Sequence, residues 1–219
     1  MEACYNRRVL KILRQRDIRR SQRMRLRGKQ GVTIVNKMTA VKKLVMTGMC
    51  TALCVILPML FHGIPNAGSI FLPMHIPVLL CGLICGAPYG LICGIAGPFL
   101  SSMLTGMPPM AYLPGMMIEL AIYGLVSGLI MRTVGSGKLY ADLYLSLIAA
   151  MLAGRIAGGA VNALIFAAGK YSFAAWTASY FVTCWPGLII QLALIPSIVV
   201  ALEKAKVIDK RYQREEARV

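Results

Sequence analysis

The fold is decided by residues 71–132, which begin FLPMHIPVLLCGLICGAPYGLICGIAGPFLSSMLTGMPP and close with AYLPGMMIELAIYGLVSGLIMR. Two short, glycine-rich apolar segments meet at Ala87 and Pro88 and are followed by a proline-rich loop. A longer apolar segment then carries one carboxylate, Glu119. This pattern is typical of a membrane-embedded protein with an internal cavity.

The composition of the whole chain supports a membrane protein. Of its 219 residues, 58% are hydrophobic and only 15% are charged, which is too apolar for a soluble domain of this size. The net charge is +16, but residues 1–37 alone contribute +10, from twelve Lys and Arg against Glu2 and Asp17. The remaining charge flanks apolar segments, as the positive-inside rule expects, so the basic balance does not indicate nucleic-acid binding.

The basic arm, residues 1–37, contains no apolar run long enough to cross a bilayer. It is consistent with an anchor for anionic lipids, an RNA-binding arm, or an extension upstream of a start at Met38. We favour the extension or a disordered, lipid-facing arm. The expected organisation is therefore an arm at 1–37, a membrane domain at 38–204 and a charged cytoplasmic tail at 205–219.

Apolar segments predict an all-α membrane domain with six transmembrane helices, since most of them can cross a hydrocarbon core of about 30 Å. A break between the second and third is expected because the residue before a proline avoids the α region and proline lacks an N–H donor. The expected helices are 41–61, 71–86, 88–104, 111–131, 140–168 and 178–202.

Positive charges predict the orientation. Lys42 and Lys43 precede the first helix, Arg132 and Lys138 flank the connection between the fourth and fifth, and further Lys and Arg follow the sixth. Because six crossings return the chain to its starting side, all these charges fall on one side, with both termini in the cytoplasm.

Small residues recur every four positions, a spacing that lets helix backbones approach closely in lipid. We expect most of them to serve packing inside the protein. Gly48 and Ala52 on the first helix are the best candidates for docking a partner protein, because that helix enters directly from the basic flank. The glycines with this spacing are Gly82, Gly86, Gly90 and Gly94, Gly124 with Gly128, and Gly154 with Gly158.

Ionisable residues inside apolar spans are costly and are candidates for function. Two stand out, Glu119 in the fourth segment and Arg155 in the fifth, at depths that differ by roughly one helical turn of about 5.4 Å. Two interpretations remain open: a structural ion pair that fixes the two helices, or contact of one or both with a polar ligand.

Further polar and aromatic residues could complete a ligand pocket with mostly apolar walls. For Trp185 and the tyrosines an interfacial aromatic belt explains the positions equally well, and His75 also suits a hydrogen bond at a helix end. The additional candidates are His75, Tyr123, Asn162, Trp185 and Gln191, with Tyr112 near the start of the fourth helix.

The sequence holds no pattern of an enzyme. It lacks a histidine near a nucleophile, paired carboxylates in one segment and a phosphate-binding glycine-rich lysine motif, so we expect no catalytic residues and no ATP hydrolysis by this chain. Six of the seven cysteines lie in apolar segments without further metal ligands nearby, which favours packing over a metal site.

The run Leu72-Pro73-Met74-His75-Ile76-Pro77-Val78-Leu79-Leu80, with Gly82, Gly86, Tyr89-Gly90-Leu91 and Gly94 after it, resembles the S component of energy-coupling factor (ECF) transporters. The later run from Glu119 to Gly128, ELAIYGLVSG, strengthens the resemblance, which covers about residues 38–202.

This resemblance implies a multi-pass subunit of a bacterial plasma-membrane importer that binds a water-soluble vitamin or related micronutrient from outside. It would dock on a transmembrane T component powered by two cytoplasmic ATPases, which use the ATP, so that this chain needs no cofactor and no metal. The family docks through Ala-x-x-x-Ala on its first helix, and Gly48-x-x-x-Ala52 is the nearest match. Loops at 62–73, 105–114 and 169–177 would cover the pocket.

Two questions stay open at this point. The alternative function is a self-contained proton-coupled secondary transporter or channel in which Glu119 carries the proton. The nutrient is also undefined, because Arg155 would favour a carboxylate whereas the aromatic side chains would suit a ring.

Overall fold

The computed structural model describes residues 33–34, 38–61, 63, 67–163, 176, 178, 182–209 and 211–213. The chain divides into two compact units, one at 37–209 and the other formed by 1–36 together with 210–219. In the second unit, strand β1 (Thr33–Ile34) pairs antiparallel with strand β2 (Tyr212–Gln213), with Ile34 opposite Tyr212.

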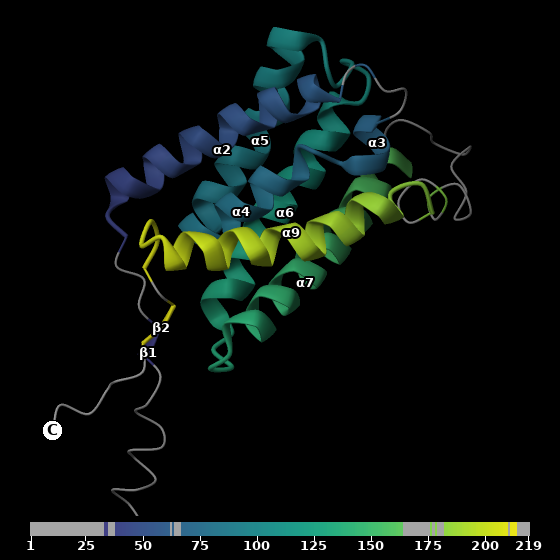
Figure 1. Ribbon diagram of the computed structural model, residues 1–219. Helices are drawn as coiled ribbons and strands as arrows, with labels where there is room; N and C mark the ends of the chain where they lie inside the picture. The colour runs from purple at the N-terminus through teal and green to yellow at the C-terminus, as the bar shows by residue number, and fades with distance from the viewer. Residues whose placement is uncertain are drawn as a thin grey trace, which may run out of the picture. The chain divides into compact units, whose positions relative to one another are not determined.

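The unit at 37–209 is helical in its described part (Figure 1). Its long helices are apolar, and five of those in the described residues are long enough to cross a membrane, namely α2, α5, α6, α7 and α9. The sixth apolar segment, α4, is shorter. The helices are α2 (Ala40–Leu60), α3 (Ala67–Phe71), α4 (His75–Cys85), α5 (Ala87–Thr105), α6 (Leu113–Thr133), α7 (Leu139–Val161) and α9 (Trp185–Lys204).

The short helix α4 lies in the interior. It packs against α2, α5, α6 and α9, and in Figure 1 it lies between α2 and α9. Every residue of α4 is buried except Ile76, which is partly buried. Its 11 residues rise only about 16 Å, about half of a bilayer core. A helix of this length is tolerated at membrane depth because its ends meet protein instead of lipid.

The predicted break between the second and third segments is confirmed. Helix α4 ends at Cys85, Gly86 has a φ of 101°, and α5 begins at Ala87 with Pro88 in its first turn. A positive φ of this size favours glycine, and a proline in the first turn removes a donor that would have no partner within the helix.

The expected start of the second segment at Phe71 is wrong for α4, which begins at His75. Leu72 has a φ of 50° and Pro73 has no N–H, so the chain turns before the helix starts. The backbone N–H of His75 donates to the Leu72 carbonyl at 3.1 Å, which closes this turn.

The last helix also starts later than expected. Helix α9 begins at Trp185, not near Ala178, and Pro186 lies in its first turn, the position where proline is favoured. Helix α7 is described to Val161; the part of its expected range that runs to 168 lies outside the described residues beyond Ala163.

Glycine packing joins α5 to α6, as the spacing predicted. A Cβ atom added to Gly90 would meet the carbonyl oxygen of Gly124, and one on Gly94 would meet that of Leu120. A Cβ on Gly124 would in turn meet the carbonyl of Gly90. The two backbones are therefore so close that only glycine fits, and this contact holds the centre of the bundle together.

Candidate functional site

A buried polar cluster forms around Glu119 at the level where α4 begins. Tyr123, one turn further along α6, donates its hydroxyl hydrogen to Glu119 Oε1 at 3.2 Å. The Nε2 atom of His75 lies 3.7 Å from the same oxygen, and the His75 ring packs edge-on against the Tyr123 ring with centroids 5.1 Å apart. Glu119 is 8% exposed and His75 is 2% exposed, so both groups are almost completely removed from solvent.

The surroundings of Glu119 are suited to a negative charge. The Tyr123 hydroxyl supplies a hydrogen bond, and the polar His75 ring lies beside the carboxylate. His75 is also the first residue of α4, where the helix dipole has its positive end. An ionisable group at this depth is costly without such partners, so the three residues form one electrostatic unit.

Arg155 lies at the same level on α7. A Cβ on Gly154, the preceding residue, would lie 3.0 Å from the Tyr123 ring and 3.1 Å from the Glu119 backbone oxygen, so α7 meets α6 beside Glu119. Arg155 is buried, and the Trp176 indole N–H donates to its backbone oxygen at 3.3 Å. In the described residues the Glu119 carboxylate contacts Tyr123 and His75, and no salt bridge joins it to Arg155 there.

Cys184, which caps the start of α9, lies close to both charges. Burial raises the pKa of its thiol; the Arg155 charge and a hydrogen bond with Arg155 oppose this shift, and the Glu119 charge adds to it. The residue thus connects the start of α9 to the cluster on α6 and α7. Nothing in the sequence singled out Cys184, although it lies seven residues before Gln191 and so shares its face of the helix.

Gln191 is the polar residue that α9 contributes to the interior, and it is 1% exposed. One turn earlier, Gly187 packs against the backbone of Ile70 and Phe71, just before α4 begins. Within the described part of the chain, the side-chain nitrogen of Gln191 and both ring nitrogens of His75 have no hydrogen-bond partner. Unpaired buried polar atoms are rare in native proteins, so these atoms require an explanation.

The remaining predicted residues differ in how near they lie to this cluster. Asn162 follows α7 and is partly buried; a Cβ on Gly115 would lie 3.5 Å from its side-chain oxygen, which places it at the start of α6, one turn before Glu119. Trp185 is 59% exposed and Tyr112 is also exposed, as expected for residues facing lipid or the interface. The structure therefore brings together His75, Glu119, Tyr123 and Arg155, with Gln191 on the neighbouring helix.

Asp142 is a further buried ionisable residue, in addition to His75, Glu119 and Arg155, and the sequence interpretation missed it. It lies in the first turn of α7, which begins at Leu139, and it is completely buried. Its Oδ1 accepts hydrogen bonds from both the backbone N–H and the hydroxyl of Ser136. These bonds fix the connection between α6 and α7, far along both helices from Glu119, so Asp142 has a structural role.

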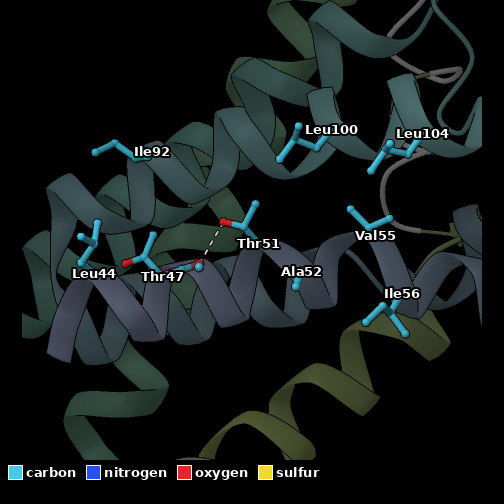
Figure 2. Close-up of a pocket in the computed structure, with 10 residues that line it drawn as sticks. Leu44, Thr47, Thr51, Ala52, Val55, Ile56, Ile92, Leu100 and Leu104 are labelled. Atoms are coloured by element: carbon cyan, nitrogen blue, oxygen red, sulfur yellow. Dashed lines mark hydrogen bonds between the residues drawn. The ribbon is translucent and has the colours of Figure 1, made fainter. Parts of the chain in front are cut away.

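A second feature is an apolar groove between α2 and α5 with a volume of about 690 Å³ (Figure 2). The hydroxyls that reach it are already used, since Thr47 donates to the Lys43 carbonyl at 2.8 Å and Thr51 donates to the Thr47 carbonyl at 2.9 Å. The groove therefore suits an apolar surface and not a polar solute. Its lining residues are Leu44, Thr47, Gly48, Thr51, Ala52, Val55, Ile56, Ile92, Leu100 and Leu104.

The cysteines pack as apolar side chains. Six of them are buried free thiols, and two contact threonines of the groove: Cys81 donates to Thr47 Oγ1 at 3.5 Å, and Cys93 Sγ lies 3.6 Å from Thr51 Oγ1. Among the residues the structure describes, no group of three or more His, Cys, Asp or Glu side chains could hold a metal ion.

A bundle with five described helices long and apolar enough to cross a membrane, together with a buried polar cluster and an apolar groove, is typical of a multi-pass membrane protein. A comparison with protein-family models then matches residues 42–206 to the ECF transporter, substrate-specific component. The chain belongs to this family, as the resemblance predicted, and is a component of a transporter. No curated protein matches the chain significantly.

Proposed function

We propose that this chain is the S component of an ECF-type ABC transporter, which binds a water-soluble vitamin or related micronutrient with high affinity for uptake. The observation that carries the proposal is the buried cluster of His75, Glu119, Tyr123 and Arg155 within an apolar helical bundle. Such groups are expensive to bury in a membrane unless they serve a function, and membership of the family supplies the solute-binding role.

The proposed partners are a transmembrane T component and two cytoplasmic ATPases that hydrolyse the ATP. The groove between α2 and α5 is the proposed docking site for the T component, through Gly48 and Ala52. A Cβ on Gly48 would meet no atom within 4 Å among the described residues, so the close approach that glycine permits is left for another helix.

The proposed location is the bacterial plasma membrane, with both termini in the cytoplasm. Arg132 at the end of α6 and Lys204 at the end of α9 support this orientation through the positive-inside rule. The pairing of β1 with β2 supports it as well, because it holds residues 33–34 next to residues 212–213, on one side of the membrane.

The first test is uptake of the compound released from the purified protein. The chain is purified in detergent and denatured, and the released compound is identified by mass spectrometry. Uptake of that compound is then measured in cells that express the chain with and without the T component and the ATPases. We expect uptake only with the complete set. Uptake that persists without the ATPases and collapses with the proton gradient would instead establish the proton-coupled alternative.

The site itself is tested with Glu119→Gln and Arg155→Met. Each is expected to weaken binding of the released compound by about tenfold or more, because a charged hydrogen-bonding group is lost from a buried site. Ser197→Ala is the matched control, since the Ser197 hydroxyl donates only to the Ala193 carbonyl on the exposed side of α9. If both variants keep the affinity and the thermal stability of the parent protein, the cluster has no role in binding.

A further inference from the structure

The solute can be described more closely from His75 and Gln191, whose side-chain polar atoms lack hydrogen-bond partners in the part of the chain that the structure describes. His75 and Gln191 lie on α4 and α9, which pack against each other. Gly187 contacts the backbone of Phe71. Gln191 lies four residues after Gly187, and His75 lies four residues after Phe71. Both side chains are at least nine-tenths buried, so neither finds its missing partner in bulk water.

The missing hydrogen bonds define a pattern. The side-chain nitrogen of Gln191 can only donate, so it requires an acceptor. A neutral imidazole has one donor and one acceptor nitrogen, so His75 requires one of each. Its Nε2 lies 3.7 Å from Glu119 Oε1, which is too long for a hydrogen bond. A carboxylate offers only acceptors and an ammonium group only donors, whereas an amide, lactam or ureido edge offers both side by side.

The charges around the cluster limit the solute in a second way. Of the described residues beside it, Glu119 is negative and Arg155 is positive, so these two balance. A solute with a net charge would leave one charge uncompensated in a site of low dielectric constant, which is unfavourable. An uncharged solute keeps this balance.

We propose that His75 and Gln191 recognise an amide-, lactam- or ureido-type edge on a solute that carries no net charge. This proposal rests on the proposed function, since it specifies the solute bound at the same site. His75 and Gln191 are then specificity-determining residues, and Glu119 lies next to the solute, beside His75.

The test uses pairs of compounds that share a body and differ in charge: nicotinamide and nicotinate, panthenol and pantothenate, biotin amide and biotin, riboflavin and riboflavin 5′-phosphate. Binding to the detergent-purified full chain is measured by thermal shift and by equilibrium dialysis. We expect the uncharged member of at least one pair to bind about tenfold or more tightly than its charged partner, the scale of one uncompensated charge or lost hydrogen bond.

Tighter binding by the charged member of every pair that binds would overturn this inference and leave the proposed function intact. A complete absence of binding by all eight compounds would count against the proposed function and the inference together.

A substitution separates recognition from structure. Gln191→Met keeps the length of the side chain and removes the unpaired amide, so the melting temperature without solute should rise. The same variant should bind the uncharged compound about fivefold or more weakly. A purely structural Gln191 would give a lower melting temperature and unchanged affinity, and an unchanged affinity refutes its role in recognition.

His75→Phe is the second variant, because it keeps the edge-on contact with Tyr123 and removes both nitrogens. It should also weaken binding of the uncharged compound. Ser146→Ala is the control: Ser146 is buried on α7 more than two turns before Arg155, and its hydroxyl contacts the sulfur of Met131. It should leave the affinity unchanged, and a loss as large as that of Gln191→Met would contradict the assignment.

Discussion

Two faces of the bundle carry the same spacing of small residues and use it differently. Between α5 and α6, Gly90 and Gly94 meet the backbone of the facing helix so closely that no Cβ could be accommodated. On α2, Gly48 and Ala52 have the same spacing, but Gly48 has an open space beside it in the described part of the chain and lines an apolar groove. The pattern indicates a surface that a helix can approach, and it does not say which helix.

The surroundings of each helix explain the difference. Helix α6 contacts α4, α5 and α7, so its small residues face neighbours of the same chain. Helix α2 contacts α5 and α4 on one side, and its other large side chains, such as Leu44, Val45 and Met49, are exposed. A small-residue pattern on a helix at the edge of a bundle is therefore the better indicator of a docking surface.

The largest effect is expected for Gly94→Val in the packed interface. Its Cβ would meet the Leu120 carbonyl oxygen and the Ala121 Cα, and backbone atoms cannot move aside as a flexible side chain can. We expect a loss of at least about 3 kcal/mol in the free energy of unfolding, with little folded protein recovered from membranes. Thermal melts followed by size-exclusion chromatography measure this, with Gly48→Val as the matched control. A Gly94→Val protein that melts like the parent would show that the two helices are not in close contact.

An intermediate effect is expected for Gly86→Ala, because this position has room for a side chain but an unfavourable backbone conformation. A Cβ on Gly86 would meet no described atom within 4 Å, but the φ of 101° is unfavourable for any residue with a side chain. We expect a loss of about 1–2 kcal/mol, measured as a lower melting temperature. Gly48→Ala, in a regular helix with open space, should be neutral or slightly stabilising. Equal melting temperatures for the two variants would contradict the difference between them.

Much of this fold could be predicted from hydropathy alone. The expected ends of α2, α5 and α6 agree with the structure within two residues, because long apolar runs bounded by polar or turn residues leave few alternatives. The starts of α4 and α9 were wrong, since Leu72 and Pro186 decide them through local backbone geometry within sequences that are apolar on both sides. A hydropathy pattern does not report such changes.

The sequence singled out residues of the buried cluster but not their contacts, and their role in binding stays a prediction. Glu119, Arg155, His75 and Gln191 stood out because polar side chains are rare in apolar spans. The contact of Glu119 with His75 depends on where α4 begins relative to α6, which is a long-range property that spacing along one helix cannot provide. Asp142 was overlooked although it lies within the expected helix at 140–168; its burial depends on the contacts of the connection between α6 and α7, which the sequence does not show.

The smallest effect on folding, with a large effect on function, is expected for Gly48→Leu. The added side chain would occupy open space in the groove, so the free energy of unfolding should stay within about 0.5 kcal/mol of the parent value. If the groove receives a helix of the T component, the same side chain prevents close approach, and uptake should fall about tenfold or more while solute binding by the isolated chain is unchanged. Met49→Leu is the control, since Met49 is exposed on α2 outside the groove lining. Normal uptake by Gly48→Leu would show that the T component docks elsewhere. A melting temperature lowered as far as that of Gly86→Ala would show that the α2 face is an internal contact, like that between α5 and α6.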